Sequence, residues 1–159
     1  MHEPPTNSMI SRVCASLQIQ GVRNMINTAE EFVNLRQSQG SREQEQASLD
    51  FADINVWLSV IEKYPDFKIW VVHNKTIQIE ILEILASDND PKIRSEVARK
   101  RKINDIIYER LSIDLDEEVR YALMYNTKLT KLQIERIKVE DSQWLKEKLV
   151  ERLEILKMK

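Results

Sequence analysis

The chain has 159 residues, of which 42% are hydrophobic and 31% are charged, and its formal net charge is −2. These values are typical of one soluble domain with room for an N-terminal extension. The near-neutral charge excludes a global electrostatic attraction to nucleic acid, because that attraction depends on basic surface. No apolar run approaches the roughly 18 residues that crossing a bilayer requires, so we expect no membrane span.

Cys14 is the single cysteine, so no disulfide can form within the chain, and we expect a cytoplasmic protein. The N-terminus, with Pro4 and Pro5, lacks the charged-then-apolar layout of a signal peptide. Glycine occurs only at positions 21 and 40. A glycine-rich phosphate-binding loop is therefore excluded after residue 40, and a helical array is favoured.

Residues 1–52 are predicted to form an N-terminal extension that contains one or two helices. Residues 1 to about 20 are polar and are expected to be loose, as chain termini of this composition often are. A short helix over 10–17 is the alternative for this stretch.

The first helix with a clear start signal lies later in this extension. Thr28 and Glu31 have the spacing of a capping box, which predicts a helix over 29–38. Gly40 is expected to end that helix as a C-cap. Residues 41–52 then form either a second helix or a polar linker.

The second predicted unit, residues 53–159, is a domain of repeated helix pairs. Asp53 is expected to cap a helix over 54–63. The apolar spacing of that helix predicts that Leu58 faces inward and that Trp57 lies near the edge.

A turn at Pro65 precedes the next predicted helix, over 67–73. Trp70 makes this helix apolar nearly all round. We expect Trp70 to pack against the N-terminal helices, because the first unit of a stacked array needs a cover. An exposed aromatic anchor is the alternative.

Residues 77–126 hold one pattern written twice at a spacing of 26 residues (111 − 85 = 26). A fixed period of this size is the signature of stacked repeats. The offset continues in both directions, so that Lys68 and Lys146 match Arg94. The matched residues are Ile81, Leu82, Leu85, Asp88, Asp90, Ile93, Arg94, Val97 and Lys100 in the first copy and Ile107, Tyr108, Leu111, Asp114, Asp116, Val119, Arg120, Leu123 and Asn126 in the second.

Each repeat is predicted to be a short helix, a tight turn and another short helix, because its apolar residues recur at helical spacing. Residues that can cap a helix stand where the helices should begin: Asp90, Asn104, Asp116, Thr130 and Ser142. The last helix is longer. We expect its leucines to face inward and its charged residues, including Arg152, to form a polar outer face.

The strings ILEILASDNDPKIRSEVARK and IIYERLSIDLDEEVRYALMYN resemble the variant leucine-rich (LRV) repeat and, more broadly, HEAT-like repeats. The resemblance covers roughly residues 55–153. It implies an all-α fold, a short α-solenoid of about four helix–turn–helix repeats with the N-terminal helices as a lid. The iron–sulfur cluster of the founding LRV protein does not carry over, because this chain has one cysteine.

The sequence offers no catalytic set, and we expect neither enzymatic activity nor a cofactor. Its two histidines, His2 and His73, are far apart, and no metalloprotease, serine-hydrolase or Cys–His motif occurs. His73 is expected to be a turn residue that bonds local backbone. The acidic turns fail the pattern of a calcium loop, so no metal site is expected.

The aspartates of these turns are better explained by structural roles. The second of each pair caps the following helix. The first, Asp88 or Asp114, can pair with a recurrent arginine, Arg94 or Arg120, in a ladder between stacked repeats.

The strongest candidate binding feature is a basic turn at residues 99–102. Six bases and one acid lie between residues 91 and 102, whereas residues 109–120 hold two bases and five acids. A solvated turn is one interpretation, and contact with phosphates or with an acidic protein surface is the other. The candidate binding residues are Lys75, Lys92, Arg99, Lys100, Arg101, Lys102 and Lys128.

Together, these patterns favour a non-enzymatic protein-binding module, since an extended repeat surface of polarised charge suits a partner. Among small bacterial proteins of this appearance, an immunity protein or antitoxin that neutralises a toxin domain is the specific role we expect. The alternative is a DNA- or RNA-binding protein that uses residues 92–102. A HEAT-like DNA glycosylase is a third and more distant alternative, because the catalytic residues of that class cannot be placed here.

Overall fold

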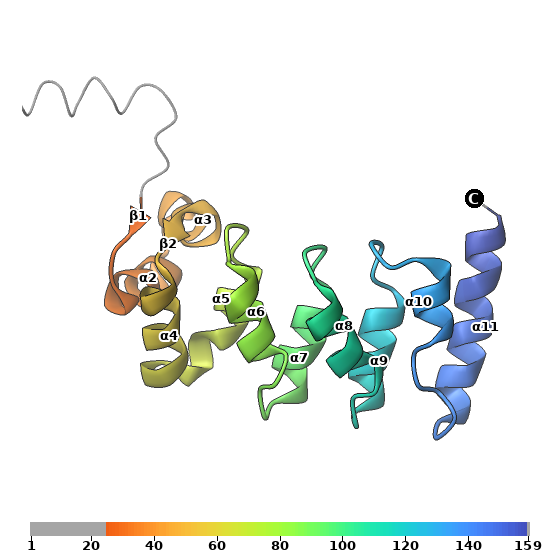
Figure 1. Ribbon diagram of the computed structural model, residues 1–159. Helices are drawn as coiled ribbons and strands as arrows, with labels where there is room; N and C mark the ends of the chain where they lie inside the picture. The colour runs from red at the N-terminus through yellow and green to blue at the C-terminus, as the bar shows by residue number, and fades with distance from the viewer. Residues whose placement is uncertain (1–24, 159) are drawn as a thin grey trace, which may run out of the picture.

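The computed structural model describes residues 25–158, and within them the predicted all-α class is confirmed (Figure 1). The only strands in this range are β1 (Met25–Ile26) and β2 (Phe51–Ala52), which pair in parallel. The predictions for residues 1–24, including the helix over 10–17, lie outside the described residues. The helices are α2 (Ala29–Gln37), α3 (Ser41–Leu49), α4 (Ile54–Lys63), the 3-10 helix η1 (Pro65–Phe67), α5 (Lys68–His73), α6 (Ile79–Leu85), α7 (Pro91–Ala98), α8 (Asp105–Ser112), α9 (Glu117–Met124), α10 (Lys131–Glu135) and α11 (Gln143–Lys157).

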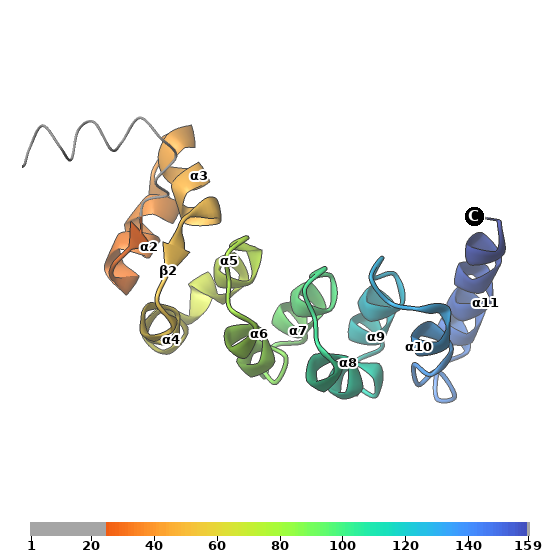
Figure 2. The same ribbon diagram turned by 45° about the horizontal axis from the view of Figure 1, so that its top comes forward.

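Successive helix pairs stack side by side in a curved row (Figures 1 and 2). The first helices of the pairs, α4, α6, α8 and α10, form the outer layer of the row. The second helices, α5, α7 and α9, form the inner layer, on the side toward which both ends of the row turn (Figure 2). We call the exposed side of this inner layer the concave surface.

Side-chain caps start the helices where the sequence places them. The side chains of Asp90 and Asp116 accept hydrogen bonds from the backbone N–H groups of Lys92 and Glu118, two residues on. Thr130 forms a complete capping box with Gln133. Each cap satisfies N–H groups that the first helical turn leaves without a partner. Asp53, Asn104 and Ser142 cap their helices in the same way.

The hydrophobic core follows the period of the sequence. Leu85 and Leu111 are fully buried, and Ile137, 26 residues further on, is 1% exposed. The core continues without interruption from Ile26 to Leu145, so that every pair shares its apolar side with its neighbours. A helix of seven or eight residues is unstable alone in water, and this shared burial is what stabilises it.

The 26-residue spacing extends into the N-terminal segment, which the sequence alone did not reveal. In the two-stranded sheet, Met25 pairs with Phe51, a separation of 26 residues (51 − 25 = 26). Beyond the sheet, α2 packs against both α3 and α4. The α2–α3 pair therefore extends the row at its N-terminal end.

The expected orientation of α4 was wrong. Trp57 is fully buried, whereas Leu58 is 38% exposed. The Trp57 ring packs edge-on against Phe32 of α2, with 5.0 Å between ring centroids. Because α4 carries apolar residues on most of its sides, its own periodicity does not identify the buried side, and the packing of α2 decides it.

The expected role of Gly40 was also wrong. Helix α2 ends at Ser38, whose backbone is extended, and the Ser38 hydroxyl accepts a hydrogen bond from the Gly40 N–H (3.0 Å). Gly40 has φ −77° and stands at the N-cap of α3. Residues 41–52 are not helical throughout, because α3 ends at Leu49 and residues 51–52 pair with β1.

Truncation of core leucines tests the shared burial. We expect Leu85→Ala and Leu111→Ala each to lower the free energy of unfolding by roughly 2–5 kcal/mol, as cavity-forming changes do. Ile106→Ala, at a position that is 55% exposed, should change it much less. Denaturant melts of the three variants measure this, and leucine variants that melt like the wild type would contradict the assigned core.

Candidate functional site

The two long edges of the row carry opposite charge. The turns inside the helix pairs, over 86–90, 113–116 and 136–142, lie along one edge, and the turns between pairs lie along the other (Figure 1). The first edge carries aspartates in each turn, and the second carries Lys75, the basic turn 99–102 and Lys128. The ion pairs between repeats lie on the first edge, and Lys75, Arg101 and Lys128 on the second edge are exposed.

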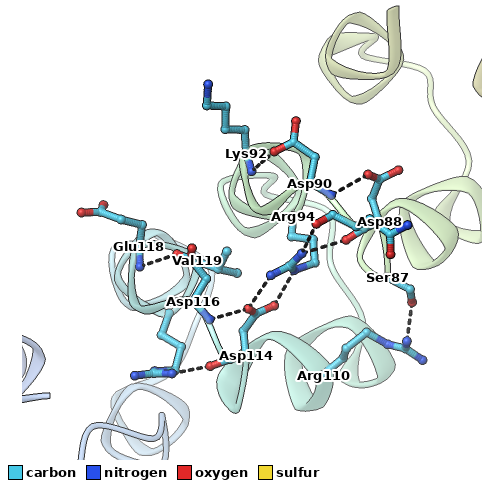
Figure 3. A network of polar contacts seen from close by, with 12 residues as sticks. Ser87, Asp88, Asp90, Lys92, Arg94, Arg110, Asp114, Asp116, Glu118 and Val119 are labelled. Atoms are coloured by element: carbon cyan, nitrogen blue, oxygen red, sulfur yellow. Dashed lines mark hydrogen bonds and ion pairs between the residues drawn. The ribbon is translucent and has the colours of Figure 1, made fainter. Parts of the chain in front are cut away.

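Along the acidic edge, ion pairs run from one repeat to the next. Arg94 binds Asp114 with two hydrogen bonds, Nε to Oδ2 (2.7 Å) and Nη2 to Oδ1 (2.8 Å) (Figure 3). Its Nη1 donates to the Asp88 carbonyl (2.8 Å), so one guanidinium holds two successive turns. Lys68 pairs with Asp88 (2.7 Å) in the same manner. We call this series the ion-pair ladder.

The ladder continues at Arg120, whose side chain is almost completely buried. Its Nη2 donates to Asp141 (2.9 Å), and its Nη1 donates to the Asp114 carbonyl. In this turn the position equivalent to Asp114 is Glu140 (114 + 26 = 140), and Arg120 binds the next residue, Asp141, instead. Lys146, the last matching position, is exposed.

The aspartates of these turns also order the backbone. The carboxylates of Asp88 and Asp114 each accept a hydrogen bond from the N–H group two residues on, at 2.9 Å. The second aspartates, Asp90 and Asp116, serve as caps. Within residues 25–158, no group of three or more His, Cys, Asp or Glu side chains is placed to hold a metal ion.

Along the basic edge, the structure gathers most of the candidate residues around one hollow of about 510 Å³. A neighbouring hollow of about 460 Å³ lies between the inner helices and is lined by Lys92 and Arg99. Lys100 is half-buried, and Lys128 is exposed on the next turn along. The first hollow is lined by His73, Lys75, Glu96, Arg99, Lys100, Arg101 and Lys102.

Arg99 occupies the centre of this region, since it also lines a third hollow of about 330 Å³ with Tyr121 and Tyr125. Its Nη1 donates to Ser95 Oγ and to Glu96 Oε1, both at 3.0 Å. These bonds orient the guanidinium, while its side chain stays 51% exposed. An oriented, exposed guanidinium is well suited to bind a carboxylate or a phosphate.

An aromatic group beside Arg99 was not anticipated. Tyr121 lies between Tyr125 and Trp144, with centroid distances of 4.8 and 4.9 Å. Arg152 lies over the Tyr125 ring at 5.3 Å and is buried, so its expected place on the outer face of α11 was wrong. The only sequence signal for this group was the spacing of four residues between the two tyrosines.

The structure also corrects the role of His73. It is the last residue of α5, and its Nε2 lies 2.9 Å from Glu96 of the next repeat rather than on local backbone. Beside it, Trp70 is partly exposed and is covered on one side by Arg36 of α2, whose guanidinium lies 3.8 Å from the ring centroid. Trp70 thus packs against the N-terminal helices and still reaches the surface.

Comparison with protein-family models, with curated proteins and with solved structures finds no match to the chain. None of the helices over residues 25–158 combines the length and the apolar character that a membrane span requires. The class of protein is therefore defined by its geometry alone: an all-α row of helix pairs with one edge held by ion pairs and the other edge basic.

The ion pairs of the ladder make the stability of the folded chain depend on pH. Burial raises the pKa of Asp114, but hydrogen bonds from Arg94 and from the Asp116 N–H, with the charges of Arg94 and Arg120, lower it by more. A carboxyl whose pKa is depressed in the folded state adds stability that is present above its unfolded pKa and is lost as the pH falls through the folded value.

We expect Asp114→Asn to lower the free energy of unfolding by roughly 3 kcal/mol at neutral pH, since it leaves a mostly buried arginine unpaired. The wild type should then lose stability more steeply than this variant as the pH falls below about 4. Urea melts at a series of pH values measure both effects. Leu85→Ala is the control, because its pH slope should match the wild type, and an equal slope for Asp114→Asn would contradict the ladder's contribution.

Proposed function

We propose that the chain is a non-enzymatic protein-docking module that binds an acidic partner along its concave surface and basic edge. The observation that carries this proposal is the position of Arg99, which lies where three hollows meet and is oriented by Ser95 and Glu96. A surface of this kind binds by complementary charge and shape, which give specificity and a fast encounter.

The surroundings of Arg99 support a protein partner. Tyr121 and Tyr125 line a hollow that Arg99 also lines, and tyrosine and arginine are among the residues enriched at the centres of protein interfaces. The basic turn adds an exposed rim of positive charge. This combination of an aromatic centre and a charged rim matches the usual layout of a protein-binding surface.

The specific role that we propose is that of an immunity protein or antitoxin, which neutralises a toxin domain by occupying it. Such a protein needs a complementary surface and no catalytic group. A cytoplasmic location is part of this proposal and rests on the single cysteine of the chain.

DNA or RNA binding through residues 92–102 is the second candidate. The observation in its favour is the lysine and arginine cluster around the hollow of the basic edge. One feature weighs against it. Tyr121, Tyr125 and Trp144 pack on one another, which leaves fewer ring faces for stacking bases.

Affinity capture from a nuclease-treated lysate of the native source tests the proposal. The wild type is compared with the variant Lys92→Glu/Arg99→Glu/Arg101→Glu and with a control of equal charge change, Arg136→Glu/Lys146→Glu/Lys157→Glu, whose residues are all exposed elsewhere. We expect a discrete protein to be captured by the wild type and the control and to be lost with the first variant.

Two results would contradict the docking proposal. One is capture of the same protein by all three chains, which would place the binding surface elsewhere. The other is capture of no protein after nuclease treatment together with copurification of nucleic acid without it. In the second case the salt dependence of binding should be steep, as phosphate contacts require.

A further inference from the structure

The turns of the basic edge are joined by a repeated asparagine, and one turn breaks the pattern. Asn74, Lys100 and Asn126 stand at equivalent positions, 26 residues apart (100 − 74 = 126 − 100 = 26). Asn126 is buried, and its Nδ2 donates to the carbonyls of Ala98 (2.7 Å) and Lys100 (2.8 Å) in the preceding repeat. Asn74 makes the same kind of link to Ala47 and Asp50.

The side-chain oxygen of each asparagine also accepts a backbone hydrogen bond, which a lysine side chain cannot do. Asn126 Oδ1 accepts a hydrogen bond from the Lys128 N–H (2.9 Å), and Asn74 Oδ1 accepts one from the Thr76 N–H (2.8 Å). Lysine has donors only. In the middle turn, Lys100 Nζ keeps the link to the preceding repeat by donating to the Asn74 carbonyl (3.0 Å), but the turn lacks the acceptor that both of its neighbours have.

Around Lys100, positive charge exceeds negative charge. The hollow of the basic edge is lined by three lysines, Lys75, Lys100 and Lys102, and by two arginines. Its one carboxylate, Glu96, already binds His73 and Arg99. Burial lowers the pKa of the Lys100 ammonium, and the charges of Lys102 and Lys75 lower it further. A bound anion would offset the repulsion between Lys100 and the other two lysines.

We infer that Lys75, Lys100 and Lys102 form a carboxylate-binding site, which takes an aspartate or glutamate side chain of the docked protein. This inference rests on the proposed docking function and gives the chemistry of the partner at that same surface. Lys100 has two N–H donors beyond the one used on Asn74, and a carboxylate has the acceptor oxygens that match them. Because the site is positively charged, the segment of the partner protein that it binds is acidic.

The matched variants are Lys100→Asn and Lys146→Asn. Lys100→Asn installs the residue that the two equivalent turns already use, so we expect the fold to be retained while the ammonium is lost. Lys146→Asn removes one positive charge from an exposed position of α11, away from the basic edge, and leaves the hollow unchanged. The probes are hexaglutamate peptide, hexathymidylate and inorganic phosphate, titrated at equal ionic strength.

We expect the wild type and Lys146→Asn to bind hexaglutamate equally and Lys100→Asn to bind it roughly tenfold more weakly, as the loss of a charged hydrogen bond implies. Unchanged hexaglutamate binding by Lys100→Asn would overturn the site. Tighter binding of hexathymidylate or phosphate than of hexaglutamate, lost with Lys100→Asn, would also overturn it in favour of a phosphate site.

A second measurement does not depend on the folding of a variant. In the wild type with ¹³C-labelled lysine, hexaglutamate should raise the pKa of Lys100, which burial and the neighbouring lysines lower in the free protein, and an unchanged pKa for Lys100 would overturn the site. The two proposals fail separately. If capture is lost with the Arg99 variant but Lys100→Asn binds hexaglutamate like the wild type, the docking proposal stands and the carboxylate site is contradicted. If capture is unchanged by the Arg99 variant but Lys100→Asn binds hexaglutamate more weakly, the site is supported and docking is contradicted.

Discussion

An arginine or lysine of each central repeat binds an aspartate in the turn of the next repeat, and the rest of the structure depends on this link. Arg94 holds the Asp114 carboxylate with two bonds and the Asp88 carbonyl with a third, so that it fixes two turns at once. The helices it joins are only seven or eight residues long and cannot bury an apolar side alone. Ion pairs of defined geometry set the spacing at which Leu85 and Leu111 meet in one core.

The two edges of the row differ in how their charged side chains are engaged. On the acidic edge the aspartates are engaged in caps, turns and ion pairs, so that edge serves the fold. On the basic edge the buried asparagines Asn74 and Asn126 join the repeats, and Lys75, Arg101 and Lys128 are exposed beside them. Lys100 stands where the neighbouring turns have a buried asparagine, and in our proposal its ammonium group binds a carboxylate of the partner.

The sequence predicts the features that depend on local chemistry or on the period. These are the all-α class, the turn aspartates as caps, and a recurrent arginine near a recurrent aspartate. It could not predict which aspartate each arginine binds, because Asp88 and Asp114 are both plausible partners of Arg94 until the repeats are stacked. Trp57, Arg152 and His73 were misplaced for a similar reason: their surroundings are set by neighbouring helices, and one helix's periodicity does not report them.

Site-specific photo-cross-linking tests the central claim, that the concave surface meets a protein partner, most directly. The photoreactive residue p-benzoylphenylalanine replaces Tyr121 on the concave surface in one chain and the exposed Ile106 on the outer helix α8 in another. Both chains are irradiated in a lysate of the native source. The account predicts one discrete cross-linked protein from position 121 and none from position 106. A protein cross-linked only from position 106, or nucleic acid cross-linked from position 121, would contradict it.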